Sequence, residues 1–196
     1  MESLHTNKPH LLIMVGIPGS GKSFFAEHFS GYFSAPIISS ELIRKELFNS
    51  PNYSKDEELA ISKISNYLLI EIMKTNKTIV YRANTETRQE RSNIYSICKE
   101  NGYIPLVIWV QTDIINSKKR ITKIASGNND MLDYFEHKLV KFNPPIVSEK
   151  AVVISGKHTF DSQLKIVLKH LANSNEVLFE PKTYVKPTDK RHFLIR

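Results

Sequence analysis

The chain has 196 residues, 41% of them hydrophobic, which is enough for one domain with a buried core and short for two. Its single cysteine excludes an internal disulfide, and no cationic segment leads into a long apolar stretch near the first residue, so we expect a cytoplasmic protein with no membrane partner. Lysine and arginine (27) outnumber aspartate and glutamate (20), and the formal net charge of +7 suits an anionic ligand such as a nucleotide and permits nucleic acid.

The first predicted strand, residues 11–15, runs directly into a glycine-rich loop. Residues 16–23 read Gly-Ile-Pro-Gly-Ser-Gly-Lys-Ser and match G-x-x-x-x-G-K-[ST], a loop whose backbone N–H groups wrap the phosphates of a nucleoside triphosphate. Residues 24–29 continue with helical character, which is the context that this loop requires. We predict that the chain binds a nucleoside triphosphate, and ATP by default because no Asn-Lys-x-Asp guanine motif occurs.

Each position of this loop has a chemical role. The glycines let the main chain approach the phosphates, and the helix that begins near Lys22 points free N–H groups at the same anion. Lys22 should reach the β- and γ-phosphates, and the Ser23 hydroxyl should ligate Mg²⁺. The predicted nucleotide-binding residues here are Gly16, Pro18, Gly19, Ser20, Gly21, Lys22, Ser23 and Phe24.

Strands and helices alternate along the rest of the chain. Further strands are predicted at residues 36–38, 78–81, 104–110 and 151–154, and helices at residues 39–48, 56–73, 86–100, 113–124, 131–142 and 160–171. This alternation predicts an α/β fold, with a mainly parallel five-stranded sheet covered on both faces and the ligand at the carboxyl ends of the strands. We expect an N-terminal extension at residues 1–9, one domain at residues 10–174, and a basic tail or added strand at residues 175–196.

The order of these motifs resembles the small P-loop kinases related to phage polynucleotide kinase, a group that includes zeta-toxin-like kinases and is placed among the AAA-family ATPases. The likeness covers roughly residues 10–172 and rests most on the G-x-P-G-S-G-K-S loop followed by Ile-Ser-Ser-Glu-Leu-Ile-Arg at residues 38–44. It implies a three-layer αβα sandwich of the P-loop NTPase type with a small helical lid. It also implies that Glu41 is a general base and that Arg44 positions the substrate. From spacing alone, Glu41 is equally an acid favoured by the dipole in the first turn of a helix.

The third strand departs from the pattern of these relatives. They end this strand in Asp-Ala followed by Asn or Thr, where the Asp helps to hold Mg²⁺, but residues 79–85 read Ile-Val-Tyr-Arg-Ala-Asn-Thr. Arg82 therefore replaces a negative group by a positive one, a reversal worth on the order of several kcal/mol before screening. Either Arg82 contacts a phosphate of the substrate and Mg²⁺ is held otherwise, or magnesium-dependent turnover is impaired. The nearest acid is Glu86.

The resemblance also assigns a lid to residues about 113–143, which closes on the triphosphate. Arg120 matches the first lid arginine of the relatives, and Lys123 stands where they often carry another. Lysine lacks the planar fork of arginine, so Lys123 is expected to serve the same role more weakly.

Other cationic side chains are candidates for contacts with the ligands. Arg88 and Arg91 follow the third strand and could bind a phosphate of the substrate, although each could equally be a surface residue. Gly156 and Lys157 follow the fifth strand, where the loop of the relatives often borders the adenine.

Three functions remain open on this reading. The leading one is an ATP-dependent phosphotransferase, in which Lys22, Ser23 and Arg120 hold ATP and Glu41 activates a hydroxyl of a polynucleotide 5′ end, a nucleoside or a small metabolite. The second is a module that binds a nucleotide or nucleic acid and has lost fast chemistry because of Arg82. The third is a plain ATPase that uses water as the acceptor. The acceptor and the oligomeric state are left open by the sequence.

Overall fold

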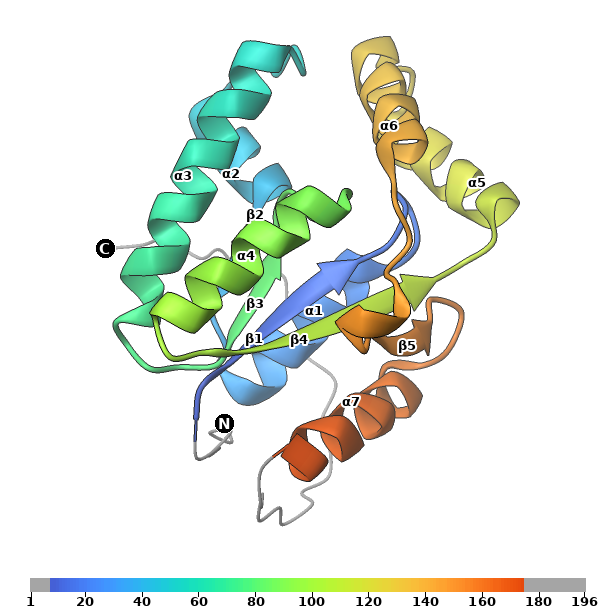
Figure 1. Cartoon of the computed structure of the whole chain (residues 1–196). Helices are drawn as coiled ribbons and strands as arrows, with labels where there is room; N and C mark the ends of the chain where they lie inside the picture. The colour runs from blue at the N-terminus through green and yellow to red at the C-terminus, as the bar shows by residue number, and fades with distance from the viewer. Residues whose placement is uncertain (1–7, 175–196) are drawn as a thin grey trace.

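Five strands form one sheet, and every neighbouring pair in it is parallel. The computed structural model describes residues 8–174, so the predicted C-terminal tail and most of the predicted N-terminal extension lie outside the described residues. The strands stand in the order β2-β3-β1-β4-β5 (Figure 1). They are β1 His10–Val15, β2 Ile37–Ser39, β3 Ile79–Arg82, β4 Ile104–Gln111 and β5 Val152–Ser155. The predicted α/β class with a parallel five-stranded sheet is confirmed.

The helices lie close to where the apolar spacing predicts them. They are α1 Lys22–Phe33, α2 Ser40–Leu47, α3 Lys55–Met73, α4 Arg88–Glu100, α5 Ile114–Ala125, α6 Asn129–Lys141 and α7 Phe160–Ser174, with a short 3-10 helix, η1 Val147–Glu149, that was not predicted. Side chains of Ser39, Ser54, Thr87, Asp113 and Asn128 accept hydrogen bonds from the first turns of five of these helices, which explains where those helices begin.

The start of α4 differs from the prediction in a way that matters for the site. Thr87 and Glu90 form a reciprocal capping box, in which the Thr87 hydroxyl accepts from the Glu90 N–H (3.2 Å) and the Glu90 carboxylate accepts from the Thr87 N–H (2.8 Å). The helix therefore begins at Arg88, and Glu86 belongs to the loop that leaves β3.

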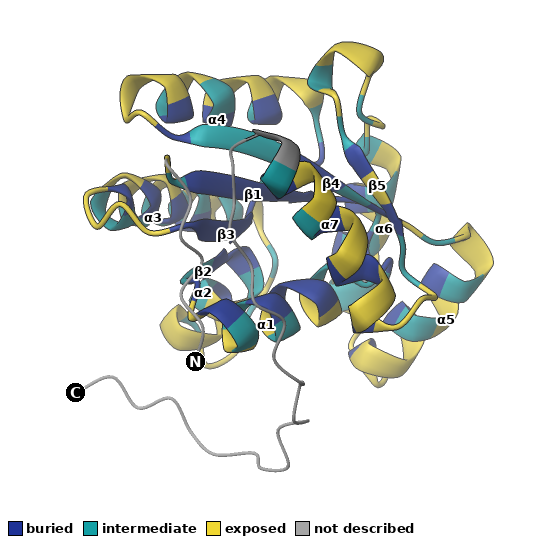
Figure 2. Cartoon of the chain, turned by 90° about the horizontal axis from the view of Figure 1, so that it is seen from below, coloured by how far each residue is buried: buried dark blue, intermediate teal, exposed yellow. Residues whose placement is uncertain are grey.

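The sheet is covered on both faces, which gives three layers. One face carries α1 and α7 and the other carries α3 and α4, and the central strands lie between them as the dark blue, buried layer of Figure 2. Alternate residues of β1 pack into the two layers, with Leu12 and Met14 on the α1 and α7 side and Leu11, Ile13 and Val15 on the other. This burial fixes β1, the strand that leads into the glycine-rich loop.

Helices α5 and α6 form a separate pair beyond the carboxyl ends of β1 and β4 (Figure 1). They occupy the segment predicted as a lid. Within residues 8–174, no helix combines the length and the apolar composition that crossing a membrane requires. Cys98 is fully buried in α4, and burial raises the pKa of its thiol to about 12.

The packing of α1 on the sheet generates a prediction about stability. Phe29 is fully buried, and its ring lies 4.7 Å from the ring of Phe33 between centroids. We expect Phe29→Ala to lower the free energy of unfolding by about 3–5 kcal/mol, because it removes apolar contacts and leaves a cavity. Urea unfolding followed by circular dichroism measures this. Tyr67→Ala on the outer side of α3, where Tyr67 is 66% exposed, is the matched control and should change it by less than about 0.5 kcal/mol. Equal losses in both variants would contradict the packing described here.

Candidate active site

The glycine-rich loop connects β1 to α1 at the carboxyl edge of the sheet. Gly16, Gly19 and Gly21 have φ angles of 149°, 75° and 113°, which side chains with a Cβ rarely adopt. Gly21 caps α1 without a side-chain hydrogen bond, so the first N–H groups of α1 remain directed at the loop. The hydroxyl of Ser20 is buried and has no partner within residues 8–174. This is the geometry of an anion-binding loop.

The side chain of Lys22 lies over this loop. Its ammonium donates to the carbonyl oxygens of Gly16 (2.7 Å) and Ile17 (3.1 Å). Burial lowers the pKa of Lys22 to about 8, although the carboxylates of Glu86 and Glu41 oppose that shift. The ammonium is therefore held where a phosphate would replace the two carbonyl oxygens, and Ser23 and Phe24 are exposed beside it.

Arg82 is buried at the tip of β3 and pairs with two acids. Its guanidinium donates to Glu41 at the start of α2 (3.0 Å) and to Glu27 of α1 (3.5 Å). In the register of the sheet, Arg82 stands beside Ser39, the last residue of β2, which brings Glu41 within reach. The reversed charge predicted from the sequence is thus compensated by two carboxylates.

This pairing governs the ionisation of Glu41. Burial favours a raised pKa, but the charges of Arg82 and Lys22 outweigh it and hold the pKa of Glu41 at about 2. One oxygen of the carboxylate also accepts a hydrogen bond from the Ser39 hydroxyl (3.0 Å). Glu41 is therefore ionised and engaged, and its role as a base stays a prediction.

Arg44 of α2 is buried, and its role in positioning the substrate stays a prediction. Its Nε donates to Glu57 of α3, its Nη1 donates to the Tyr134 hydroxyl of α6 (3.2 Å), and its guanidinium packs over the rings of Tyr53 and Tyr134. Its Nη2 is buried without a partner among the described residues. Arg44 therefore joins α2, α3 and α6, and Nη2 is the atom left to contact a substrate.

Arg91 is fully buried in α4 and binds protein groups through all three guanidinium nitrogens. It forms a two-point ion pair with Glu149 (2.6 and 3.0 Å), and its Nη1 faces the carbonyl oxygens of Thr85, Glu86 and Asn143. A contact between Arg91 and a substrate stays a prediction, and it would require one of these bonds to break. Arg88 is exposed on the first turn of the same helix.

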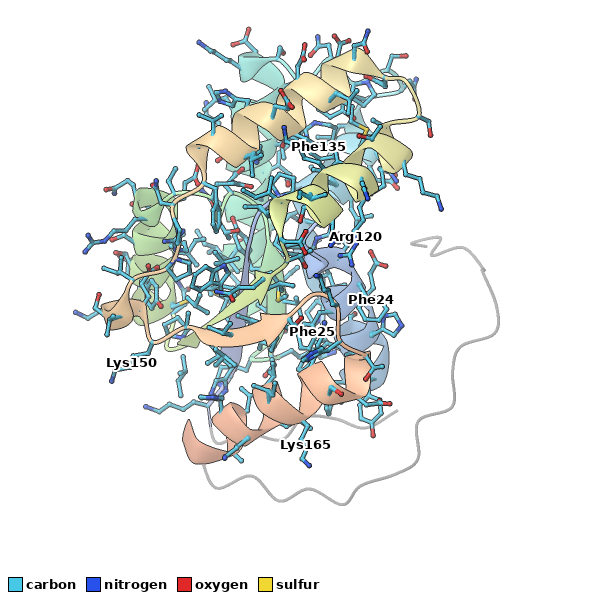
Figure 3. The ribbon with its side chains drawn as sticks, turned by 90° about the vertical axis from the view of Figure 1, so that its right-hand side faces the viewer. Phe24, Phe25, Arg120, Phe135, Lys150 and Lys165 are labelled. Carbon is cyan, nitrogen blue, oxygen red and sulfur yellow. The ribbon has the colours of Figure 1, made fainter. Side chains whose placement is uncertain are left out.

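Arg120 of α5 reaches across the phosphate loop, as Figure 3 shows next to Phe24. Its Nη1 donates to the carbonyl oxygens of Gly19 (3.2 Å) and Ser20 (3.4 Å), and its Nη2 donates to that of Gly156 (3.2 Å). The structure thus brings together two residues predicted for the nucleotide, Arg120 and Gly156. It places Lys123 on the exposed face of α5, where it lines a shallow groove with Lys118, Lys119, Ile115 and Thr122.

Gly156 touches the phosphate loop so closely that no side chain fits there. A Cβ at this position would overlap the carbonyl oxygen of Ser20 and the hydroxyl of Thr112. Thr112 donates to the same Ser20 oxygen (2.8 Å). The loop after β5 therefore supports the back of the phosphate loop, and Lys157 next to it is exposed and pairs with Asp113 (2.6 Å).

Buried ion pairs around the site include residues that sequence reasoning missed. Lys138 of α6 is buried and pairs with Glu58 of α3 (3.2 Å) and Glu86 (3.1 Å). Burial works against its charge, but these acids raise the pKa of Lys138, so it stays protonated. The sequence does not predict this pair, because Lys138 and Glu86 stand 52 residues apart.

The magnesium ion expected with the nucleotide has a limited set of partners in the chain. Mg²⁺ takes oxygen ligands and is usually held by one or two carboxylates together with phosphates and water. Within residues 8–174, no group of three or more His, Cys, Asp or Glu side chains could hold a metal ion. The Ser23 hydroxyl is exposed at the start of α1 and can serve as one such oxygen ligand, and its role with Mg²⁺ stays a prediction.

Comparisons with known proteins agree with this geometry. The family model described as AAA domain matches residues 11–138. Human 6-phosphofructo-2-kinase/fructose-2,6-bisphosphatase 1 is 26% identical in an alignment 159 residues long, which covers 69% of this chain and 32% of that protein. The chain thus spans about a third of the length of this curated relative.

Solved structures show the same fold at low identity. The APS kinase of Mycobacterium tuberculosis, solved in complex with AMPPNP and APS, has a TM-score of 0.64 and 14% identity, covering 85% of this chain and 98% of that one. A gluconokinase from Sinorhizobium meliloti has a TM-score of 0.60 and 16% identity, covering 86% of this chain and 94% of that one. The fold is therefore that of P-loop kinases.

The contact between Gly156 and the phosphate loop generates a prediction about nucleotide binding. We expect Gly156→Ala to weaken ATP binding about tenfold or more, because the added Cβ displaces the backbone at Ser20. Isothermal titration calorimetry with ATP measures this. Gly31→Ala in α1 is the matched control, since a Cβ there meets nothing within 4 Å, and its affinity should equal that of the parent. Unchanged affinity in Gly156→Ala would show that the loop tolerates the displacement.

The pairing of Arg82 with Glu41 generates a prediction about ionisation. Arg82→Met removes the cation that favours the charged carboxylate, so we expect the pKa of Glu41 to rise from about 2 toward the usual range of about 4. In the parent, the depressed pKa of Glu41 means that its ionised carboxylate stabilises the fold at neutral pH. This stabilisation is lost as the pH falls toward 2, and Arg82→Met lacks it at neutral pH as well. A pH titration of side-chain carboxyl carbons by NMR measures the shift. Lys45→Met, an exposed change on the same helix, should leave the pKa at about 2. A low pKa retained in Arg82→Met would show that other charges hold it.

Proposed function

The chain belongs to the AAA domain family, and on that premise we propose that it is an ATP-dependent phosphotransferase that moves the γ-phosphate of ATP to a hydroxyl group. The observation that carries this proposal is the charge balance around the phosphate loop. Arg82 pairs with Glu27 and Glu41, so the arginine at the tip of β3 is neutralised and does not stand as a free cation in the place of the expected acid.

The residues of the loop would hold and polarise ATP. A triphosphate entering the loop would replace the carbonyl oxygens that now accept from Lys22, and the N–H groups at the start of α1 would bind its oxygens. Mg²⁺ held by Ser23 and the phosphates would neutralise further charge there. Arg120 lies over the same loop and would stabilise the charge that develops during transfer.

The acceptor is a hydroxyl compound of the kinds expected from the sequence. The compared proteins are kinases named for small acceptors, so a small metabolite is the acceptor that we would test first, beside a nucleoside and a 5′-hydroxyl oligonucleotide. We also propose that the chain is related to the polynucleotide kinases and zeta-toxin-like kinases. This proposal rests on the sequence of the phosphate loop and of residues 38–44.

One observation favours a second candidate, a nucleotide-binding module with slow chemistry. The pKa of Glu41 is about 2, and a carboxylate that binds protons so weakly is a poor general base at neutral pH. Arg82→Asp separates the two functions. Faster turnover in this variant would support the module disabled by Arg82, whereas slower turnover would support the phosphotransferase, in which Arg82 neutralises Glu27 and Glu41.

The proposed phosphotransferase predicts acceptor-dependent formation of ADP from ATP and Mg²⁺. Lys22→Ala should lower this rate by about 100-fold or more, because it removes the cation that binds the transferred phosphate. A coupled assay of ADP with the acceptor panel measures it. Lys118→Ala, an exposed change on the outer face of α5, should keep the parent rate. ADP formation that does not depend on any acceptor would instead support a plain ATPase.

A further inference from the structure

Glu86 is a buried acid that the assignments above leave without a role. The residue is 9% exposed, and one carboxylate oxygen, Oε1, accepts from the ammonium of Lys138 (3.1 Å). The other oxygen, Oε2, is buried and has no hydrogen-bond partner within residues 8–174. A buried carboxylate oxygen without a partner is costly, so it calls for a group that binds there.

Two hydrogen bonds fix the segment that carries Glu86. The Thr85 hydroxyl donates to the carbonyl of Met14 in β1 (2.7 Å), and the Asn143 N–H donates to the carbonyl of Glu86 (2.8 Å). The loop after β3 is therefore tied to the strand that enters the phosphate loop and to the segment that leaves α6. Burial lowers the pKa of Lys22, and the negative charges of Glu86 and, to a smaller extent, Glu41 oppose that shift.

The cation that pairs with Glu86 also pairs with a second carboxylate. Lys138 is shared by Glu86 and Glu58, so this group of three carries one negative charge more than positive charges. Glu41, by contrast, has its Oε2 engaged by Arg82 and Ser39 (3.0 Å each). Of the two carboxylates near Lys22, Glu86 is the one with an unengaged, buried oxygen.

A donor without a partner lies in the same loop. The side-chain amide nitrogen of Asn84, two residues before Glu86, is buried and unpartnered among the described residues. An alcohol donates one hydrogen bond and can accept others, so a carboxylate oxygen and an amide N–H are the two kinds of partner that an alcohol acceptor needs.

We propose that Glu86, and not Glu41, is the general base of the transfer, and this inference rests on the proposed phosphotransferase function. Its Oε2 accepts the proton of the acceptor hydroxyl. The acceptor oxygen forms a bond to the γ-phosphorus, and the bond from that phosphorus to the oxygen bridging to the β-phosphate breaks. The products are ADP, the phosphorylated acceptor and the proton held on Glu86, which passes to solvent.

The decisive experiment compares three single variants, Glu86→Gln, Glu58→Gln and Glu41→Gln, in acceptor-dependent ADP formation over a range of pH. We expect Glu86→Gln to lower kcat by about 10²- to 10⁴-fold, with the Kd of ATP within about threefold of the parent value. The fall of kcat at low pH that reports the base should disappear in this variant. Glu58→Gln removes the other acid partner of Lys138 and should keep kcat within about threefold of the parent.

A second variant distinguishes the loss of a base from the loss of structure or of an ion pair. Glu86→Ala should regain activity when formate is added, because a small carboxylate can enter the space and accept the proton, whereas a loss of structure would not be rescued. Thermal unfolding of each variant checks that it is folded.

Two results would overturn the assignment while leaving the phosphotransferase intact. One is a parental kcat in Glu86→Gln together with a large loss in Glu41→Gln. The other is an equal loss in Glu58→Gln and Glu86→Gln without formate rescue, which would make Glu86 a positioning residue that acts through Lys138. Absence of acceptor-dependent turnover in the parent protein would overturn the proposed function itself, and the base assignment with it.

Discussion

The ion pairs of Arg82 with Glu27 and Glu41 are the interaction on which the rest of the site depends. The three residues come from β3, α1 and α2, and they meet because β2 and β3 are neighbours in register at their carboxyl ends. An acid at the position of Arg82 would place three carboxylates side by side near Lys22, where their repulsion would be costly in a partly buried site. The charge of Arg82 therefore compensates the charges of its two acids, and changing Arg82 to an acid would leave those charges unbalanced.

A second set of buried ion pairs joins helices α2, α3, α4 and α6 to their neighbours. Arg44 with Glu57 joins α2 to α3, Arg91 with Glu149 joins α4 to η1, and Lys138 joins α6 to α3 and to the loop after β3. Removing one partner of a buried pair leaves an uncompensated charge and typically costs about 3–5 kcal/mol. The pairs of Lys138 tie α6 to α3 and to the loop after β3, and the buried ring of Tyr134 packs against Tyr53 beside them.

Much of the fold and part of the site could be predicted from local patterns. The apolar run of β1 and the glycine spacing of the phosphate loop act over a few residues, and the structure agrees with them. The predicted start of α4 at residue 86 is two residues early, because the capping box of Thr87 and Glu90 makes Arg88 the first residue of the helix. The surroundings of Arg91 could not be predicted, since its partner Glu149 stands 58 residues away and nothing in the spacing connects them.

The contact of Gly156 with the carbonyl of Ser20 has a consequence for biosynthesis. The phosphate loop precedes β3, β4 and β5 in the chain, but the loop that supports it follows β5, the last strand among the described residues 8–174. A nascent chain therefore carries an unfinished nucleotide site until β5 joins the outer edge of the sheet beside β4. A fragment that ends before β5 lacks this support, so under the proposed function we expect ATP to stabilise chains that have been translated through β5 more than shorter ones.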